Sequence, residues 1–291
     1  CIKINPTTIP DKWVTWLTLD CLEKINAKDA IIQRPKIIYF TLIGKSPALT
    51  PAVNFSINHS NVVTAVSQHL REETLNCFSI RKEIKVIPNF IDFDLHNYTF
   101  DKDLHMHYAP NREKIMIHIS NFRPVKRVAD VIRVFVNVRE KIPVKLLMVG
   151  DGPQREVAEY LCRDLGCSDD VKFLGKTQDV SRLLAISDLF VLPSEKESFG
   201  LVALEAMAAG IPVVSSNTGG LAHVNINGVT GYTSAVGDVA KMSNDAILLL
   251  SDKGKYNEFA QNALSAAKEY DICKILPLYE AVYREALETI K

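Results

Sequence analysis

The sequence predicts a soluble α/β protein built on a parallel sheet, from the order of its strand and helix patterns and from its composition. From about Lys114 onward, short runs rich in β-branched residues alternate with longer segments in which apolar residues recur every three or four positions. Hydrophobic residues make up 47% of the 291 residues and charged residues 23%, a balance typical of a soluble globular protein with a sizeable core. Strands that alternate with helices indicate a parallel sheet covered on both faces.

Each element of this second half follows from its own pattern. Six strands are expected, at residues 114–120, 144–150, 171–175, 189–193, 212–216 and 231–234. Four helices are expected between them, at residues 125–142, 153–166, 179–187 and 198–210. In the last helix we expect Ser198 to be the N-cap and Gly210 to end the helix. Sheets of this kind bind ligands at the carboxyl ends of their strands, where turns lead into helices.

The first hundred residues are less regular. The runs NVVTAVS and KEIKVIPNF are expected to be strands of a second sheet, with a helix at residues 69–80 between them, and weaker signals predict a helix at 13–25 and a strand at 36–43. Residues 93–112 are polar and aromatic without periodicity, so we expect them to connect two domains. The domains predicted are 1–110 with this linker, 111–275, and a C-terminal helix at 276–291 that could pack back on the first domain.

Composition and charge exclude several classes of protein. Lys plus Arg and Asp plus Glu number 34 each, so no overall field attracts nucleic acid or an anionic membrane. The longest apolar runs fall far short of the roughly 20 residues that span a bilayer. No signal peptide is recognisable at the start, and six scattered cysteines without CxxC spacing favour free thiols. These features predict a cytoplasmic protein, or a chain whose true start is missing.

The turn Ser194–Ser198 is a candidate anion site, because the N–H groups at the following helix start, Gly200 included, favour a phosphate group. Glu197 and Glu205 flank this start, and along a helix they would be about 10 Å apart. That spacing suits two ends of one long ligand better than the pair of carboxyls, about 5–5.5 Å apart, of a retaining glycoside hydrolase. A structural ion pair or a solvent-facing gap is the alternative for Glu205.

A second cluster follows the strand at 114–120, where Asn121, Arg123, Lys126 and Arg127 crowd one turn. Three cations in five residues can neutralise a diphosphate, although a solvated charged face is the alternative. Glycine-rich turns follow two other expected strands, at residues 150–153 and 219–220, and they could approach the same ligand with their backbone.

Neither the histidines nor the common catalytic and nucleotide-binding motifs indicate a further site. His105 and His107 are expected in a loop, and His118 is expected to be a hydrogen-bonded core residue rather than a catalytic one. The sequence contains no HExxH, GxSxG, GxxxxGK[ST] or GxGxxG, which weakens the interpretations as a zinc protease, serine hydrolase, P-loop protein or dinucleotide dehydrogenase.

Six motifs taken in order resemble one known family: SNFRPVKR, LLMVGDGP, VKFLGK, ISDLFVLPSEKESFGLVALEAMAAGIPVVSS, NTGG and GVTGY. Together they resemble the donor-binding domain of the retaining family 4 glycosyltransferases, over about residues 120–238. The resemblance implies the GT-B fold, two Rossmann-like domains facing a cleft, the first of them incomplete here. It also implies that Glu197 lies near the transferred sugar and Glu205 on the ribose of the nucleotide.

The resemblance assigns the other site residues too. Arg123 and Lys126 act with Glu197 in catalysis, and the diphosphate meets the helix start. Glu205 binds the ribose, main chain near Gly152, Gly175 and Lys176 holds the uracil, and Gly219 and Gly220 orient the sugar. The full set of expected donor-binding residues is Asn121, Gly152, Gly175, Lys176, Ser198, Phe199, Gly200, Leu201, Glu205, Gly219 and Gly220. No cofactor and no metal ion are expected, because the cations and the helix start carry the charge of the leaving group.

HISNFRPVKR combined with LPSEKESFGL is most similar to the members that transfer N-acetylglucosamine from UDP-N-acetylglucosamine to L-malate in bacillithiol synthesis. The alternatives are another UDP- or GDP-sugar-dependent member, or a nucleotide-sugar-binding module without catalysis. Where relatives read IPEV, this chain places His223 instead of a carboxylate, and it lacks their Gly-rich loop and HGTD segment, so no acceptor site is assigned. No nucleic-acid or membrane partner is expected. Apolar positions on the C-terminal helix would permit a homodimer.

Overall fold

The computed structural model describes residues 49–94 and 98–288. The chain divides into two compact units, one of residues 1–87 with 278–291 and the other of residues 88–277. The helix expected at 13–25 and the strand expected at 36–43 lie outside the described residues.

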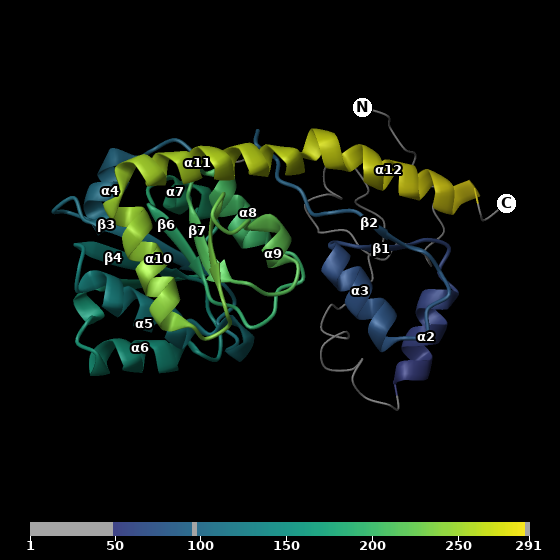
Figure 1. The fold of residues 1–291 in the computed structure, drawn as a ribbon, viewed down its shortest axis with the longest axis horizontal. Coiled ribbons are helices and arrows are strands. Elements are labelled where there is room, and N and C mark those ends of the chain that lie inside the picture. The colour runs from purple at the N-terminus through teal and green to yellow at the C-terminus, as the bar shows by residue number, and fades with distance from the viewer. Residues whose placement is uncertain (1–48, 95–97, 289–291) are drawn as a thin grey trace. The chain divides into compact units, whose positions relative to one another are not determined.

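The larger unit is built on a six-stranded parallel sheet with the order β5-β4-β3-β6-β7-β8. Its strands β3, β4, β6 and β7 are labelled in Figure 1. All six strands expected in this region are confirmed: β3 (Lys114–Ile119), β4 (Val144–Val149), β5 (Val171–Gly175), β6 (Leu189–Leu192), β7 (Val213–Ser216) and β8 (Gly231–Ser234). Every residue of β6 is buried, which requires cover on both faces of the sheet. The strand order reverses between β3 and β6, so the turns that follow these two strands flank the position where doubly wound sheets bind ligands.

Helices connect the strands and follow them. They are α4 (Lys102–Tyr108), α5 (Val128–Arg139), α6 (Arg155–Asp164), α7 (Val180–Ala185), α8 (Leu201–Ala208), α9 (Leu221–Val224), α10 (Val239–Ser251), α11 (Lys253–Ala267) and α12 (Ile272–Glu288), which continues into the smaller unit. Short 3₁₀ turns occupy Pro124–Lys126, Ser168–Asp170 and Lys268–Tyr270. All four helices expected between the strands are confirmed, as α5, α6, α7 and α8. α5 packs against α6 and α10, and α8 packs against α11.

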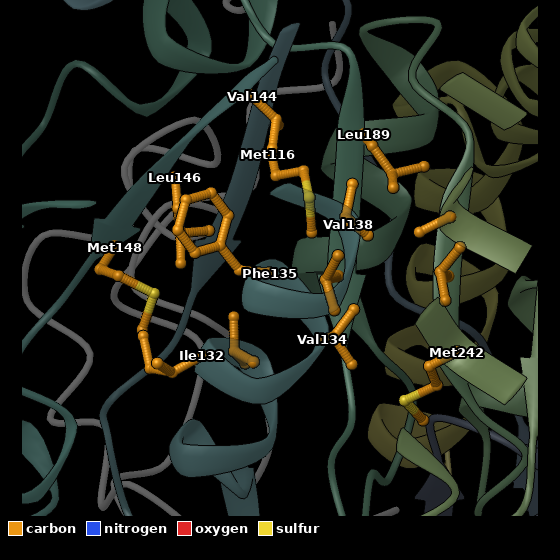
Figure 2. Packing of buried hydrophobic residues seen from close by; sticks show 14 of the residues in the cluster. Met116, Ile132, Val134, Phe135, Val138, Val144, Leu146, Met148, Leu189 and Met242 are labelled. Atoms are coloured by element: carbon orange, nitrogen blue, oxygen red, sulfur yellow. The ribbon is translucent and has the colours of Figure 1, made fainter. Parts of the chain in front are cut away.

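Alternation along the strands builds the core beneath α5 (Figure 2). Met116, Leu146 and Met148 come from β3 and β4 at every second position and meet Phe135 of α5, all of them fully buried. Fully burying one such side chain contributes about 1.5–3 kcal/mol to the free energy of unfolding. The period of 3.6 residues in α5 and the period of two in β3 and β4 therefore point the same side chains into one core.

The smaller unit pairs β1 (Val63–Ala65) with β2 (Ile84–Val86) in parallel, with α3 (Gln68–Cys77) between them in the chain. These three elements confirm the expectations for this region. The side chain of Ser67 caps α3 by accepting a hydrogen bond from Leu70 N at 3.1 Å. The last part of α12 belongs to this unit, where the Tyr279 hydroxyl donates to the Ile87 carbonyl at 3.3 Å. α2 (Thr50–Asn58) was not predicted from the sequence.

The prediction of a patternless connection at residues 93–112 is wrong in part, because it contains α4. Asp101 caps this helix by accepting from Leu104 N at 3.0 Å. His105 and His107 lie in the helix and not in a loop. No residue of α4 is buried, so the helix lacks the apolar periodicity by which longer helices are recognised. In the described part of the chain, no helix is both long enough and apolar enough to cross a membrane.

Candidate functional site

Most of the residues predicted to bind a ligand lie at the ends of five neighbouring strands of the parallel sheet or in the turns that follow them, whereas Leu201 and Glu205 lie in α8. Because the strands are parallel, these turns share the carboxyl edge of the sheet, in the order β5, β4, β3, β6, β7. Gly175 ends β5 and Lys176 follows it, Gly152 follows β4, Asn121 to Lys126 follow β3, residues 194–200 follow β6, and Gly219 and Gly220 follow β7. The topology therefore brings these strand ends and turns to one edge, with the strand-order reversal at its centre.

The turn after β3 is packed tightly against the turn after β4. A Cβ atom added to Gly150 would lie 1.8 Å from the Ser120 carbonyl oxygen, and one added to Gly152 would lie 2.1 Å from that of Asn121. The Gly150 N–H also donates to the Gly175 carbonyl at 2.8 Å, which joins the end of β5 to the same group. Glycine is required at 150 and 152 because no side chain fits there.

The three cations after β3 have different surroundings. Arg123 is exposed and Lys126 is half-buried. Arg127 is tied to the buried Asp130 through an Nε–Oδ2 bond of 2.6 Å, and its backbone is left-handed with φ of 50°. Arg123 is therefore the exposed cation of this turn, whereas Asp130 holds Arg127 at the start of α5.

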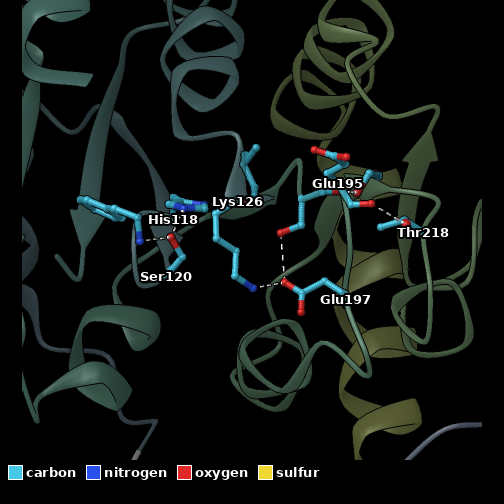
Figure 3. A network of polar contacts seen from close by, with 10 residues as sticks. His118, Ser120, Lys126, Glu195, Glu197 and Thr218 are labelled. Carbon is cyan, nitrogen blue, oxygen red and sulfur yellow. Dashed lines mark hydrogen bonds and ion pairs between the residues drawn. The ribbon is translucent and has the colours of Figure 1, made fainter. Parts of the chain in front are cut away.

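Glu197 is held at the centre of the edge by groups from two elements (Figure 3). The Lys126 ammonium donates to Glu197 Oε1, and the Ser194 hydroxyl donates to the same oxygen at 3.0 Å. The side chains of Lys126 and Glu197 are only 17% and 11% exposed. This ion pair joins the turn after β3 to the turn after β6, across the reversal of strand order.

The glycine turn after β7 rests directly on Glu197. The Gly220 N–H donates to the Glu197 carbonyl at 2.9 Å, and a Cβ atom on Gly219 would lie 1.9 Å from that carbonyl oxygen. The Thr218 hydroxyl donates to the Glu195 carbonyl at 2.9 Å in the same contact (Figure 3). The turn at residues 219–220 and Glu197 are therefore direct neighbours in the fold, and their shared role in binding a sugar stays a prediction.

The prediction that Ser198 is the N-cap of the following helix is wrong. α8 begins at Leu201, and its N-cap is Gly200 in a left-handed conformation with φ of 92° and no side-chain cap. A Cβ atom on Gly200 would lie 2.6 Å from Leu221 Cδ1, so close packing against α9 sets this start. Phe199 is buried against Tyr270, with the two rings 5.6 Å apart in a T-shaped arrangement, which keeps residues 198 and 199 outside the helix.

The end of α8 agrees with the sequence. The Gly210 N–H donates to the Met207 carbonyl at 2.9 Å, the Ile211 N–H donates to the Ala206 carbonyl at 3.0 Å, and Gly210 is left-handed with φ of 72°. These two bonds form a Schellman motif, which favours glycine at the left-handed position. Gly210 therefore ends the helix, as expected.

Glu205 and Glu197 lie in different environments. The estimate of their separation assumed one continuous helix, but Glu197 precedes the first residue of α8 by four positions. Half-buried Glu205 lines a pocket of about 220 Å³ with Tyr98, Gln178, Val180, Ser181 and Leu184. The two carboxylates therefore take different environments, one beside a cation and one beside hydroxyl and amide groups.

Tyr98, Gln178 and Ser181 are pocket residues that the sequence analysis missed. Burial raises the pKa of Tyr98, and the charge of Glu205 raises it further, so its hydroxyl keeps its proton. Three residues further on, Asp101 accepts a hydrogen bond from Arg182 of α7 at 2.9 Å. Because Tyr98 lies in a segment without periodicity, only the folded contact with α7 and Glu205 identifies it.

Four other residues named from the sequence are Asn121, Gly175, Lys176 and His223. Asn121 and Lys176 are exposed, and Gly175 is left-handed with φ of 66° at the last position of β5. His223 is exposed in α9. None of these side chains makes a contact that assigns it a chemical role.

His118 is a satisfied core residue, as expected. Both ring nitrogens have partners: Nδ1 lies 2.8 Å from the Val191 carbonyl oxygen and Nε2 lies 2.8 Å from Ser120 Oγ. Burial lowers the pKa of His118 to about 4, and the charge of Lys126 acts in the same direction. The ring is therefore neutral at physiological pH.

Comparison with known proteins agrees with this geometry. Residues 100–266 match the family model of glycosyl transferases group 1. The chain is 41% identical over 273 residues to the N-acetyl-alpha-D-glucosaminyl L-malate synthase of Bacillus anthracis, an alignment that covers 91% of this chain and 72% of that protein. It is 32% identical over 256 residues to an uncharacterized glycosyltransferase of Methanocaldococcus jannaschii, covering 84% of this chain and 65% of that protein.

A solved structure has a similar fold. The structure of HepE from Anabaena, in complex with UDP and glucose, superposes with a TM-score of 0.73 and 28% sequence identity. The match covers 81% of this chain and 66% of HepE, so the chain spans slightly less than two thirds of that protein. The chain belongs to the group 1 glycosyl transferases and has an α/β fold of the GT-B type.

Proposed function

We propose that the protein is a retaining glycosyltransferase that moves N-acetylglucosamine from UDP-N-acetylglucosamine to L-malate, the reaction that begins bacillithiol synthesis. The observation that carries this proposal is the Lys126–Glu197 pair across the strand-order reversal, in a chain 41% identical to an N-acetyl-alpha-D-glucosaminyl L-malate synthase. The pair supplies a cation for a diphosphate and a carboxylate for the adjoining sugar.

The diphosphate of the donor is proposed to lie between Arg123, Lys126 and the start of α8. Arg123 is exposed, and Lys126 can exchange its bond with Glu197 for one to a phosphate oxygen. The N–H groups of the first helical turn add the partial positive charge of the helix start. As the bond between sugar and phosphate breaks, negative charge grows on the phosphate, and these groups stabilise it. No metal ion is required in this proposal.

The sugar and the nucleoside are proposed to occupy opposite ends of the site. Glu197 accepts hydrogen bonds from sugar hydroxyls, and the backbone of Gly219 and Gly220 orients the ring from the other side. Glu205 accepts from the ribose hydroxyls in the pocket beside α7. At about 220 Å³ this pocket is smaller than the roughly 300–1,000 Å³ typical of drug-sized ligands, so it suits part of a nucleotide sugar and not the whole. Main chain at Gly152, Gly175 and Lys176 is proposed to contact the uracil.

The test is release of UDP from UDP-N-acetylglucosamine by the full-length protein, with and without L-malate. We expect turnover that requires malate, that is unchanged by EDTA, and that yields the α-linked product. Turnover only with another acceptor, or only with a GDP-sugar, would refute the proposed substrates but not the membership of the glycosyl transferase family. UDP binding by calorimetry without turnover for any acceptor would favour a binding module, and loss of activity in EDTA would refute a metal-independent mechanism.

A further inference from the structure

His118 makes two hydrogen bonds from a fully buried position in β3, although the proposed reaction assigns it no role. One bond joins it to Val191 of β6, the strand that leads to Glu197, and the other joins it to Ser120 at the start of the turn that carries Arg123 (Figure 3). An apolar ring could fill the same space without desolvating two polar atoms, so packing alone does not account for an imidazole.

The direction of each bond follows from the chemistry of its partners. A carbonyl oxygen only accepts, so His118 Nδ1 carries the hydrogen and donates to Val191. Because the buried ring is neutral, Nε2 has a lone pair and accepts the Ser120 hydroxyl hydrogen at 2.8 Å. The Ser120 oxygen in turn accepts the Phe122 N–H at 3.2 Å. The hydroxyl is thereby fixed in one orientation.

The turn held by Ser120 is strained. Phe122 has φ of 38°, in the left-handed region, which costs a residue other than glycine about 1–2 kcal/mol. Three contacts hold it there: its N–H on Ser120, its carbonyl accepting from Gln154 N at 2.9 Å, and its buried ring 6.0 Å from the His118 ring. Arg123 follows directly, and its carbonyl accepts the Lys126 N–H at 2.8 Å. The backbone angle at Phe122 therefore sets the direction of the segment that carries both cations.

We propose that His118 is a positioning residue for the donor site: through the Ser120 hydroxyl it holds the turn 120–123 in the conformation that presents Arg123 and Lys126 to a diphosphate. The inference rests on the proposed function, since the diphosphate is the ligand concerned. It adds that the imidazole acts through its bond to Ser120, and that the bond to Val191 serves mainly to orient the ring.

A matched pair of variants separates the two bonds. In His118→Gln the side-chain amide reaches the position of Nε2 and can bond Ser120, whereas in His118→Asn it reaches only the position of Nδ1 and can bond Val191. Both variants place a neutral amide in the same buried site, so their general destabilisation is similar. Ser120→Ala removes the hydroxyl at a half-buried position without disturbing the core. Arg123→Ala reports on the diphosphate site itself.

The measurements are UDP affinity by calorimetry, KM for UDP-N-acetylglucosamine, and melting temperature, all on the full chain. We expect Ser120→Ala and His118→Asn to weaken UDP binding by about three- to tenfold, the range for one hydrogen bond. His118→Gln should stay within about twofold of the wild type, although both histidine variants melt at lower temperature.

Equal UDP affinities in His118→Gln and His118→Asn, or an unchanged affinity in Ser120→Ala, would overturn the inference. If Arg123→Ala still weakens UDP binding in that case, the proposed donor site stands and only the role of His118 is refuted. If Arg123→Ala binds UDP like the wild type, the donor site itself is wrongly placed and the inference falls with it.

Discussion

Lys126 and Glu197 form an ion pair between the turns that follow β3 and β6, the two strands at which the order of the parallel sheet reverses. Both side chains are largely buried, and Ser194 donates to the same carboxylate oxygen. Even with no ligand bound, the Glu197 carboxylate therefore accepts two hydrogen bonds, from Lys126 and Ser194. Lys126 has one anionic partner, and in the proposed site a phosphate oxygen replaces it. This relationship makes the two residues the most informative targets for substitution.

Replacing either partner of this pair should impair catalysis. We expect Lys126→Met to lower kcat/KM for UDP-N-acetylglucosamine by about 100-fold, because a cation at the leaving group contributes on this scale. Glu197→Gln should lower kcat more than UDP affinity, since UDP lacks the sugar. Steady-state kinetics and UDP calorimetry check both, with exposed Lys141→Met, outside the ligand-binding turns, as the control. Full activity in Lys126→Met would refute its role.

The two arginines of the β3 turn should differ in effect. Arg123→Ala is expected to weaken UDP binding by about tenfold or more, the worth of a charge-assisted hydrogen bond. Arg127→Ala should leave UDP affinity within about twofold and lower the melting temperature, because it removes one of the two cations that neutralise buried Asp130. Calorimetry and thermal unfolding separate the two effects. If Arg127→Ala weakened UDP binding and Arg123→Ala did not, Arg127 would have to exchange its ion pair with Asp130 for one with UDP.

Glu205→Gln should weaken UDP binding by about tenfold, because one charged hydrogen-bond acceptor is lost. The variant should also lose the distinction between UDP and an analogue without both ribose hydroxyls, which the wild type is expected to discriminate. Exposed Glu195→Gln is the matched control. If Glu205→Gln still discriminates between the two ligands, the ribose is bound elsewhere.

Gly219 and Gly228 offer a matched test of the glycine turn. Both are left-handed, with φ of 56° and 77°, but a Cβ atom at Gly219 meets the Glu197 carbonyl at 1.9 Å, whereas one at Gly228 meets nothing within 4 Å. Gly228→Ala should lower the free energy of unfolding by about 1–2 kcal/mol and leave the kinetics unchanged. Gly219→Ala should cost more and also lower kcat/KM at least about tenfold. If Gly219→Ala and Gly228→Ala changed stability and kcat/KM equally, the contact between Gly219 and Glu197 would have no role in catalysis.

Stability should fall in acid because of His118. Its pKa is about 4 in the folded protein and 6.5 in the reference state, so between these values the unfolded chain binds a proton that the folded one does not. Unfolding is therefore favoured as the pH drops, by up to about 3 kcal/mol at pH 4. Denaturant unfolding from pH 7 to pH 4 measures this slope. It should be shallower in His118→Gln, and an unchanged slope would assign the acid sensitivity to other groups.

Much of the larger unit could be predicted because its signals are local. β3 is a short run of mostly apolar, buried residues, α5 carries the period of 3.6 residues that its buried face requires, and Gly210 ends α8 because a Schellman motif favours glycine there. α4 was missed because it buries no residue and so has no periodic face. Ser198 was wrongly chosen as an N-cap because packing of Phe199 and Gly200 against distant residues, not the local sequence, sets the start of α8.

The sequence by itself determined the strand and helix order and the turns that carry charge and glycine, and from these it predicted a ligand site at the carboxyl edge of a parallel sheet. The tertiary structure decided which of those residues meet. The pairing of Lys126 with Glu197 depends on strand order, and the separation of Arg127 from Arg123 depends on the burial of Asp130. The places of Tyr98 and His118 depend on contacts between segments far apart in the chain. Such contacts leave no periodic trace in the sequence, because they depend on three-dimensional packing and not on local conformational preference.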